Sequence, residues 1–438
     1  MEDWVVSGSL ALCTTIVLML LSMPVAFSFL LVSLGGMYLV AGGAGAVQVI
    51  ANASVSVTHF AFLPIPLFLL MGELFFHSGV ASKVFNAIDM LIGGMRGRLS
   101  YLTIFGGTGF AALTGTSMGN TAMLGSLLVP EMTERGYKKY MSLGPILGVG
   151  GLAILIPPSS LGVLLGSLAR IDIGRLLIAG VMPGLILAVL YLVLIYGMTR
   201  IDPGGAPDHA GGVYPIKTKM KVIVTHIVPM CGIICTVIGL ILFGIATPTE
   251  SAAFGVLGVL VVACGFGGLT LEAISKSLRG TLKVTGMLLL IVIASSTFSQ
   301  LLAFSGVTSG IISLVNGLGW PPLMMMVAMF GILLFMGMFM EQVSIMMLTI
   351  PIFFPVAHAL GFDLIWFGVV MLLALEMSGI TPPFGLNLFV LLGVAPKETS
   401  MKDVALSGAP FLFCGLLLFL LMIFFPSIAL FLPSLMGG

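Results

Sequence analysis

The sequence has very little charge. Only 8% of its 438 residues are Asp, Glu, Lys or Arg, and 59% are hydrophobic, whereas an ordinary soluble domain has about 25% charged residues. Apolar stretches of about 20 residues, the length that crosses a bilayer as a helix, recur along the chain. They are continuous rather than alternating, which argues against a transmembrane β-barrel. We therefore predict an all-α polytopic membrane protein.

Several chemical signatures are also missing. The sequence has no G-x4-G-K-[ST] phosphate-binding loop, no paired aspartates, no serine–base arrangement and no metal-ligand spacing of histidines. Its five cysteines all lie in apolar runs, as small buried hydrophobic residues do. The net charge of +1 offers no footprint for nucleic acid, and the N-terminal MEDWVVSG lacks the positive charge of a cleavable signal peptide. We therefore expect neither an enzyme nor a nucleic-acid partner.

Two double prolines interrupt the apolar runs. Pro157 and Pro158 stand in AILIPPSS, and Pro382 and Pro383 stand in GITPPFGL. A proline inside a helix costs about 3 kcal/mol or more, because it removes a hydrogen bond and clashes with the preceding turn. Both pairs end the pattern P-x5-G-[YF]-x18-[IT]-P-P, and every matched position in the two copies is separated by the interval that separates Pro157 from Pro382. This constant spacing predicts two structural repeats.

The repeats define the predicted domain organisation. Each repeat contains a hairpin that enters and leaves on one side, and a broken helix, as follows: repeat 1 over 1–200, with the hairpin 101–130 and the broken helix 141–168; a cytoplasmic linker over 201–223; and repeat 2 over 224–438, with the hairpin 322–355 and the broken helix 365–393.

The positive charges predict the orientation of the repeats. With the linker inside the cell, all of the 17 Lys and Arg residues except Arg170 and Arg175 fall on the cytoplasmic side. Each repeat crosses the membrane an odd number of times, so the second is inverted. We predict an inverted two-fold repeat with two re-entrant helical hairpins and two broken helices, the architecture of an elevator-type transporter.

The hairpin turns and the breaks are the candidate site. Non-helical backbone survives in a membrane only where it is buried or lines a cavity, because unpaired groups cost several kcal/mol in lipid. The first hairpin has TGTSMGN at its midpoint, residues 114–120, which offers hydroxyl and amide oxygens. Such residues bind an ion or a substrate, or they serve close helix packing. The second turn, GMFMEQ at 337–342, has fewer hydroxyls.

Four acidic residues lie in or beside the apolar segments. Glu250 follows Thr247 and is interpreted as a helix cap. For Glu73, Glu341 and Glu376 two readings stay open, a structural hydrogen bond and a role in transport, since intramembrane carboxylates are costly and often functional.

Five motifs carry a family resemblance. The segments GTSMGNTAMLGSLLVPEMTERGY, LIPPSS, PTESAA, GMFMEQ and ITPPFGLNLFV resemble the large membrane subunit, or M subunit, of tripartite ATP-independent periplasmic (TRAP) transporters of the ion transporter superfamily. The resemblance covers nearly the whole chain. It implies a Na⁺-driven elevator in the bacterial inner membrane that takes up an organic acid anion such as a C4-dicarboxylate or a sialic acid. It also implies a separate small four-helix membrane subunit, a periplasmic substrate-binding protein and surrounding membrane lipid as partners.

The resemblance also implies site residues, with two or more Na⁺ as coupling ions and no organic cofactor. The residues implied for the first Na⁺ site are Gly115, Ser117, Asn120, Ile156 and Ser159. Those implied for the second are Gly337, Met340, Ser378, Thr381 and Phe384. The residues expected around the substrate are Thr116, Ser117, Pro157, Pro158, Glu341, Pro382 and Pro383.

The chain departs from the family pattern around the second site. Ala374 and Ser378 stand where the family often has Asn and Gly, and Glu341 stands where it often has Asp. Three other functions stay open at this point. They are a stand-alone organic anion symporter or exchanger of a related elevator family, coupling to protons instead of Na⁺, and a channel or non-transporting scaffold. The sequence does not identify the carboxylate that is carried.

Overall fold

The structure is a computed structural model that describes residues 3–21, 23–57, 62–92, 95–207, 215–266, 268–383 and 385–436. Every regular element in these ranges is helical. Among the described residues, seven helices are long and apolar enough to cross a membrane, or up to nine if each of two bent helix pairs counts as one span. The predicted all-α polytopic class is confirmed.

The helices of the first half of the chain are α1 (Asp3–Leu20), α2 (Val25–Val57), α3 (Pro64–His77), α4 (Val80–Ile92), α5 (Arg98–Thr114), α6 (Ser117–Glu134), α7 (Lys139–Leu155), α8 (Ser160–Ala169) and α9 (Ile173–Ile201). The α-helices of the second half are α10 (Ile216–Val222), α11 (Val228–Leu242), α12 (Pro248–Gly265), α13 (Leu271–Phe304), α14 (Val307–Leu318), α15 (Pro322–Gly337), α16 (Gln342–Ala359), α17 (Leu364–Gly379), α18 (Leu386–Val394), α19 (Met401–Phe424) and α20 (Ser427–Ser434).

The helix ends follow the repeat spacing at the hairpins and breaks. The second arm of each hairpin is α6 in the first repeat and α16 in the second. These helices begin at Ser117 and Gln342, whose separation along the chain equals that of the two proline pairs. The helices before the breaks, α7 and α17, begin at Lys139 and Leu364, which have the same separation. The pair α7 and α8 bends by 42° at its break. The opposite orientation of the two repeats in a membrane stays a prediction.

One helix is much longer than its apolar run suggests. The hydropathy pattern predicts a span over 284–304, but α13 begins at Leu271. Its first turns carry Glu272 and Lys276, which form an ion pair one turn apart, and the Thr270 hydroxyl caps the helix by accepting the Ala273 N–H. A hydropathy window scores charged residues against a span even where they favour a helix. It therefore does not detect the first turns of α13, which extend beyond the apolar core.

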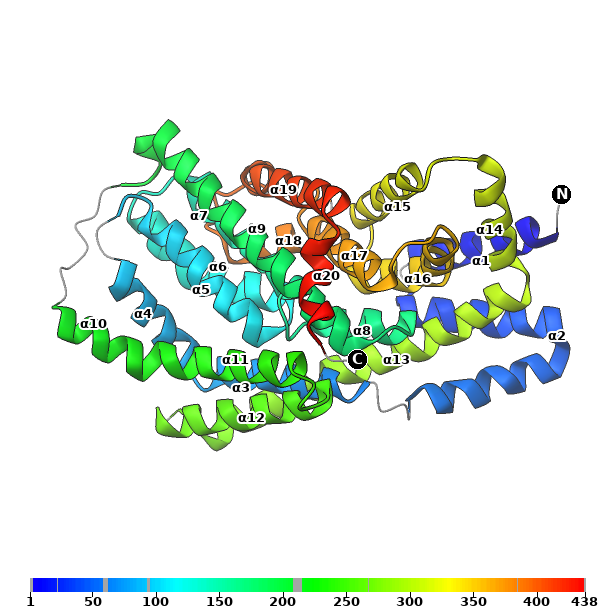
Figure 1. Ribbon diagram of the computed structural model, residues 1–438, viewed down its shortest axis with the longest axis horizontal. Coiled ribbons are helices and arrows are strands. Elements are labelled where there is room, and N and C mark those ends of the chain that lie inside the picture. Colours follow the sequence, from blue (N-terminus) through cyan, green and yellow to red (C-terminus); the bar gives the residue numbers. More distant parts are fainter. Residues whose placement is uncertain are drawn as a thin grey trace.

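The helices form two layers (Figure 1). The elements α2, α3, α11, α12 and α13 run along one long side of the molecule, where α13 packs on α2 and α3, and α12 packs on α3 and α11. The hairpins and broken helices occupy the other side, packed around α7, which contacts α5, α6, α17 and α19. The two layers meet where α3 and α13 contact α8 and the hairpin helices α5 and α16.

Charged side chains at the helix ends form ion pairs, one of which connects the two halves of the chain. Lys139 at the start of α7 donates to the Asp403 carboxylate of α19 and to the Glu398 carbonyl. Lys138 pairs with Asp202 beyond the end of α9, and this hydrogen bond, together with one from Tyr140, lowers the pKa of the Asp202 carboxyl. These two ion pairs thus lie at the ends of the apolar segments.

Gly180 of α9 packs closely against the end of α7, directly before the first break. A Cβ on Gly180 would lie 2.2 Å from the carbonyl oxygen of Leu155, the last residue of α7, whereas Gly197 on the same helix has no atom within 4 Å of that position. We expect Gly180→Ala to destabilise the protein by about 1–3 kcal/mol through overpacking. Gly197→Ala is the matched control and leaves the apparent melting temperature in detergent unchanged or slightly raised. Equal melting temperatures for the two variants would contradict this packing.

Candidate functional site

The tip of the first hairpin docks on the first break. The chain leaves α5 at Gly115, whose φ of 62° is left-handed and suits glycine. The Ser160 N–H donates to the Gly115 carbonyl over 3.2 Å, and a Cβ on Gly115 would lie 2.9 Å from the Pro158 carbonyl oxygen. The sequence therefore brings together the turn and the break that the repeat pattern singled out.

Three buried side-chain oxygens of α6 and α8 have no hydrogen-bond partner among the described residues. The Asn120 amide donates to the Val149 carbonyl over 3.0 Å, but its Oδ1 has no partner, and neither has Thr121 Oγ1 or Ser160 Oγ. Asn120 and Thr121 are fully buried. Buried polar atoms are almost always hydrogen-bonded, so each unpartnered oxygen calls for an explanation, and a bound ion is one. Oxygen atoms are the ligands that hard cations prefer.

Other residues expected at the first Na⁺ site already have partners. The Ser159 hydroxyl donates to the Ile154 carbonyl over 2.6 Å and accepts the Gly162 N–H as the cap of α8. Ser117 Oγ accepts a hydrogen bond from Asn387. Ile156 follows α7 with extended backbone, next to Pro157. Their assignment to an ion site stays a prediction.

The second hairpin and the second break are also in contact. A Cβ on Gly337 would lie 1.9 Å from Cβ of Ser378, so α15 and α17 approach as closely as glycine allows. The carbonyl oxygens of Gly379 and Thr381 both point at Gly385, where a Cβ would lie 2.7 Å and 2.8 Å from them. Carbonyl oxygens therefore gather at this break.

The side chains around the second break bond mainly to their own helix. The Ser378 hydroxyl donates to the Leu375 carbonyl, and the Thr381 hydroxyl donates to the Met377 carbonyl. Met340 lies in the hairpin turn, half-buried. Phe384, the fifth residue expected at this site, lies outside the described residues.

Two amide side chains connect hairpins and breaks. The Gln342 amide donates to the Leu375 carbonyl over 2.9 Å, and the Asn387 amide donates to Ser117 Oγ over 2.6 Å. The second bond joins the first hairpin to the helix after the second break. The contact of Asn387 with the first hairpin was not predicted, although an amide inside an apolar run was a usable signal. Thr121 and Ser160 were missed because nothing in the sequence says which hydroxyls lack a partner.

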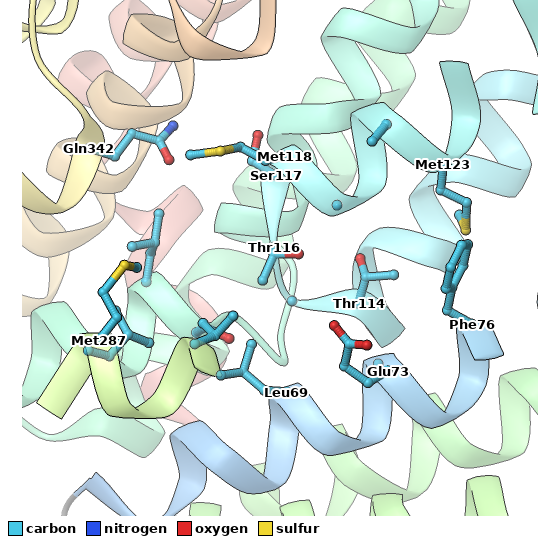
Figure 2. A pocket seen from close by; sticks show the side chains of 18 of the residues that line it. Leu69, Glu73, Phe76, Thr114, Thr116, Ser117, Met118, Met123, Met287 and Gln342 are labelled. Carbon is cyan, nitrogen blue, oxygen red and sulfur yellow. The ribbon is translucent and has the colours of Figure 1, made fainter. Parts of the chain in front are cut away.

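A cavity of about 650 Å³ lies between the hairpin tips and the other layer. Thr116 and Ser117 line it from the first tip, and Glu341 lines it from the second. The helices α3 and α13 form the opposite wall. Figure 2 shows Glu73 of α3 pointing toward Thr114, with Met118 farther along the cavity.

The proline pairs lie apart from this cavity. Pro157 and Pro158 are buried, Pro382 and Pro383 are exposed, and none of the four belongs to the cavity lining. Their role near a substrate stays a prediction.

The acidic residues have different surroundings. Glu250 forms a capping box with Thr247, which confirms its interpretation as a helix cap. Glu73 pairs with His77 over 3.1 Å and both line the cavity. Glu376 is fully buried and accepts a hydrogen bond from the Tyr191 hydroxyl over 3.2 Å, and its Oε2 has no partner in the part of the chain that the structure describes.

The bond between Asn387 and Ser117 can be tested by a double-mutant cycle. Asn387→Ala removes the donor and leaves a buried hydroxyl without it, which costs about 1–3 kcal/mol. Ser117→Ala in the same chain removes the acceptor, so we expect the second substitution to cost less in the Asn387→Ala background than in the wild type. The measurement is the apparent melting temperature in detergent of the four proteins. Fully additive shifts would show that the two side chains do not interact.

Comparisons with known proteins agree with this architecture. The family described as "Tripartite ATP-independent periplasmic transporter, DctM component" matches residues 12–428. The chain is 32% identical to the C4-dicarboxylate TRAP transporter large permease protein DctM of Pseudomonas aeruginosa, over 86% of this chain and 87% of that protein. It is 28% identical to the ectoine TRAP transporter large permease protein TeaC of Halomonas elongata, over 98% and 99% of the two chains.

Solved structures show the same fold at low identity. The YdaH transporter of Alcanivorax borkumensis superposes with a TM-score of 0.65 at 12% identity, over 90% of this chain and 89% of that one. MtrF of Neisseria gonorrhoeae gives 0.60, also at 12% identity, over 87% and 85%. The curated relatives are named as transporter permeases, not as enzymes. This multi-pass membrane protein therefore belongs to the DctM family of TRAP transporter large permeases.

Proposed function

We propose that this permease takes up an organic acid by Na⁺-coupled secondary transport in the bacterial inner membrane. The substrate is delivered by a periplasmic binding protein, and a small four-helix membrane subunit assembles with the permease as a separate chain. The tripartite family supports both partners. Relatives are named for C4-dicarboxylates, sialic acid, ectoine and isethionate, which supports an organic acid as the substrate class.

The observation that carries Na⁺ coupling is that the buried Oδ1 of Asn120 and Oγ1 of Thr121 have no hydrogen-bond partner among the described residues. They belong to the first two turns of α6, where Asn120 bonds to Val149 of α7 and Thr121 Oγ1 faces Gly150, and they lie outside the cavity lining. A small cation that reaches them would be enclosed by protein rather than exposed to the cavity. A tenfold Na⁺ gradient supplies about 1.4 kcal/mol per ion, and 100 mV adds about 2.3 kcal/mol per charge.

The two layers support an elevator mechanism. The hairpins and broken helices pack around α7 as one group, while α3 and α13 form the wall that faces them across the cavity. A Cβ on Gly72 of α3 would lie 2.9 Å from backbone atoms of Leu113 and Thr114. The two layers therefore meet closely at Gly72 and separate at the cavity, and inverted-repeat transporters alternate access by rigid-body movement of one such group of helices against the other.

The Na⁺ site is tested by conservative changes on the first hairpin. We expect Na⁺, replacing choline at constant ionic strength, to raise the apparent melting temperature of the purified permease, since a bound ligand stabilises the folded state. Asn120→Ala and Thr121→Val should shift the Na⁺ midpoint at least tenfold upward, equivalent to about 1.4 kcal/mol.

Thr103→Val is the matched control for these variants. Thr103 is also a buried threonine of this hairpin, but its hydroxyl is satisfied by the Leu99 carbonyl at 2.8 Å. The control keeps the wild-type Na⁺ midpoint. If Asn120→Ala and Thr121→Val keep it as well, the ion binds elsewhere.

Uptake into proteoliposomes separates this function from its alternatives. The proposed function requires the binding protein, the small subunit and an inward Na⁺ gradient together. Uptake without the binding protein would support a stand-alone symporter. Uptake that persists without Na⁺ and follows a pH gradient would support proton coupling, for which the buried carboxyl of Glu376 is the candidate.

A further inference from the structure

One membrane-spanning helix begins with a lysine-rich segment. The helices α10 and α11 run on through a π-helical turn, Ile223–Ile227, as one candidate span, Ile216–Leu242, of 27 residues. A helix of this length rises about 40 Å, whereas the hydrocarbon core of a bilayer is about 30 Å thick. The excess of about 10 Å is the length of the seven-residue α10, which carries Lys217, Lys219 and Lys221. We therefore place α10 at the level of the lipid headgroups.

The start of this span exposes an apolar stripe next to a lysine stripe. The apolar stripe consists of Ile216, Met220 and Val224, which are four residues apart and are 80%, 56% and 58% exposed, so they share one side of the helix. The lysine stripe consists of Lys217 and Lys221, which are also exposed and have no partner within the described part of the chain. All side chains of α10 are at least partly exposed. The two stripes are complementary to a phospholipid, which offers acyl chains and a phosphate.

Contacts with neighbouring helices hold this segment in place. The Lys83 ammonium of α4 donates to the carbonyl of Phe266, just past the end of α12, over 2.8 Å and lies 5.3 Å from the centre of that ring. The His226 ring stacks against the same Phe266 ring with centroids 5.0 Å apart. Lys219 donates to the Leu91 carbonyl of α4 over 3.5 Å, and Figure 1 shows α4 and α10 together at one end of the molecule. The lysine stripe thus belongs to a packed helix corner and not to a free linker.

We propose that α10 and the turn that follows it form a binding site for an anionic phospholipid. The phosphate accepts hydrogen bonds from Lys217 and Lys221, and one acyl chain lies along the apolar stripe. The segment 216–242 contains no Asp or Glu, so no carboxylate of this span balances the lysines or attracts the choline of a zwitterionic lipid. Each lysine near an anionic membrane surface strengthens binding about fivefold. Charge complementarity therefore selects an anionic headgroup.

The site lies on the layer formed by α2, α3, α11, α12 and α13. In the proposed function this layer is the wall against which the hairpins and broken helices move. A bound anionic lipid therefore holds the stationary part of the permease in the membrane. Lipid binding depends neither on the substrate nor on the coupling ion, so it can hold or fail independently of Na⁺-coupled uptake.

Native mass spectrometry of the purified permease in a neutral detergent measures this preference. Phosphatidylglycerol and phosphatidylcholine with the same acyl chains are titrated into the protein, and the fraction of protein with one bound lipid gives each affinity. We expect the permease to bind phosphatidylglycerol at least tenfold more tightly than phosphatidylcholine. In the double variant Lys217→Gln/Lys221→Gln, the affinity for phosphatidylglycerol should fall at least tenfold, and the affinity for phosphatidylcholine should stay unchanged.

Matched variants separate this site from a general effect of charge. Lys397→Gln/Lys402→Gln removes two exposed lysines that lie outside α10 and each precede an acidic residue, and we expect it to keep wild-type lipid binding. Lys217→Arg/Lys221→Arg keeps both charges and should retain the preference. Because the side chains of α10 are exposed or half-buried, the Gln pair should keep the wild-type melting temperature. If the pair unfolds, Lys217→Gln alone should still lower the affinity about fivefold.

Several outcomes would overturn the proposal. Equal affinities of the wild type for the two lipids would remove the preference for an anionic headgroup. An unchanged affinity for phosphatidylglycerol in the Gln variants of α10, or an equal loss in Lys397→Gln/Lys402→Gln, would remove the site. Loss of the small membrane subunit from the purified complex in Lys217→Gln/Lys221→Gln, with lipid binding unchanged, would assign this face to that subunit instead.

Discussion

Unpaired backbone is costly in hydrocarbon, and the arrangement of this permease depends on satisfying it. Each unsatisfied backbone group in lipid costs several kcal/mol, yet the chain leaves helical geometry at two hairpin tips and two breaks. The solution is mutual docking of these irregular segments. The Ser160 N–H at the first break donates to the Gly115 carbonyl at the first tip, and the Gln342 amide at the second tip donates to the Leu375 carbonyl before the second break.

Docking encloses polar atoms of the first hairpin and the first break. Asn120 and Thr121 are fully buried and outside the cavity lining, and the Oγ of Ser160 is buried as well, although Ser160 belongs to the lining. Enclosed oxygens suit an ion stripped of water. In the proposed function, an ion at these oxygens and a substrate in the cavity would occupy neighbouring sites, so that binding of one would influence binding of the other.

The sequence predicted the breaks and tips because their causes are local. Prolines cannot continue a helix, glycine accepts the left-handed geometry found at Gly115, and the pattern around them recurs with constant spacing in the second repeat. The capping box of Glu250 could be predicted for the same reason, because its partner Thr247 is only three residues away. The first turns of α13 were missed because their charged residues lower the mean hydropathy on which the prediction of that span relied. The roles of Thr121, Ser160 and Asn387 depend on which hydroxyl or amide finds a partner across helices, and tertiary packing alone decides that.

Saturable binding of ²²Na⁺ to the purified permease tests the central claim most directly. The account predicts saturable binding in wild type that is weakened at least tenfold by Asn120→Ala and retained by Thr103→Val. Absence of saturable binding in wild type, or equal affinity in wild type and Asn120→Ala, would contradict an ion site at the first hairpin.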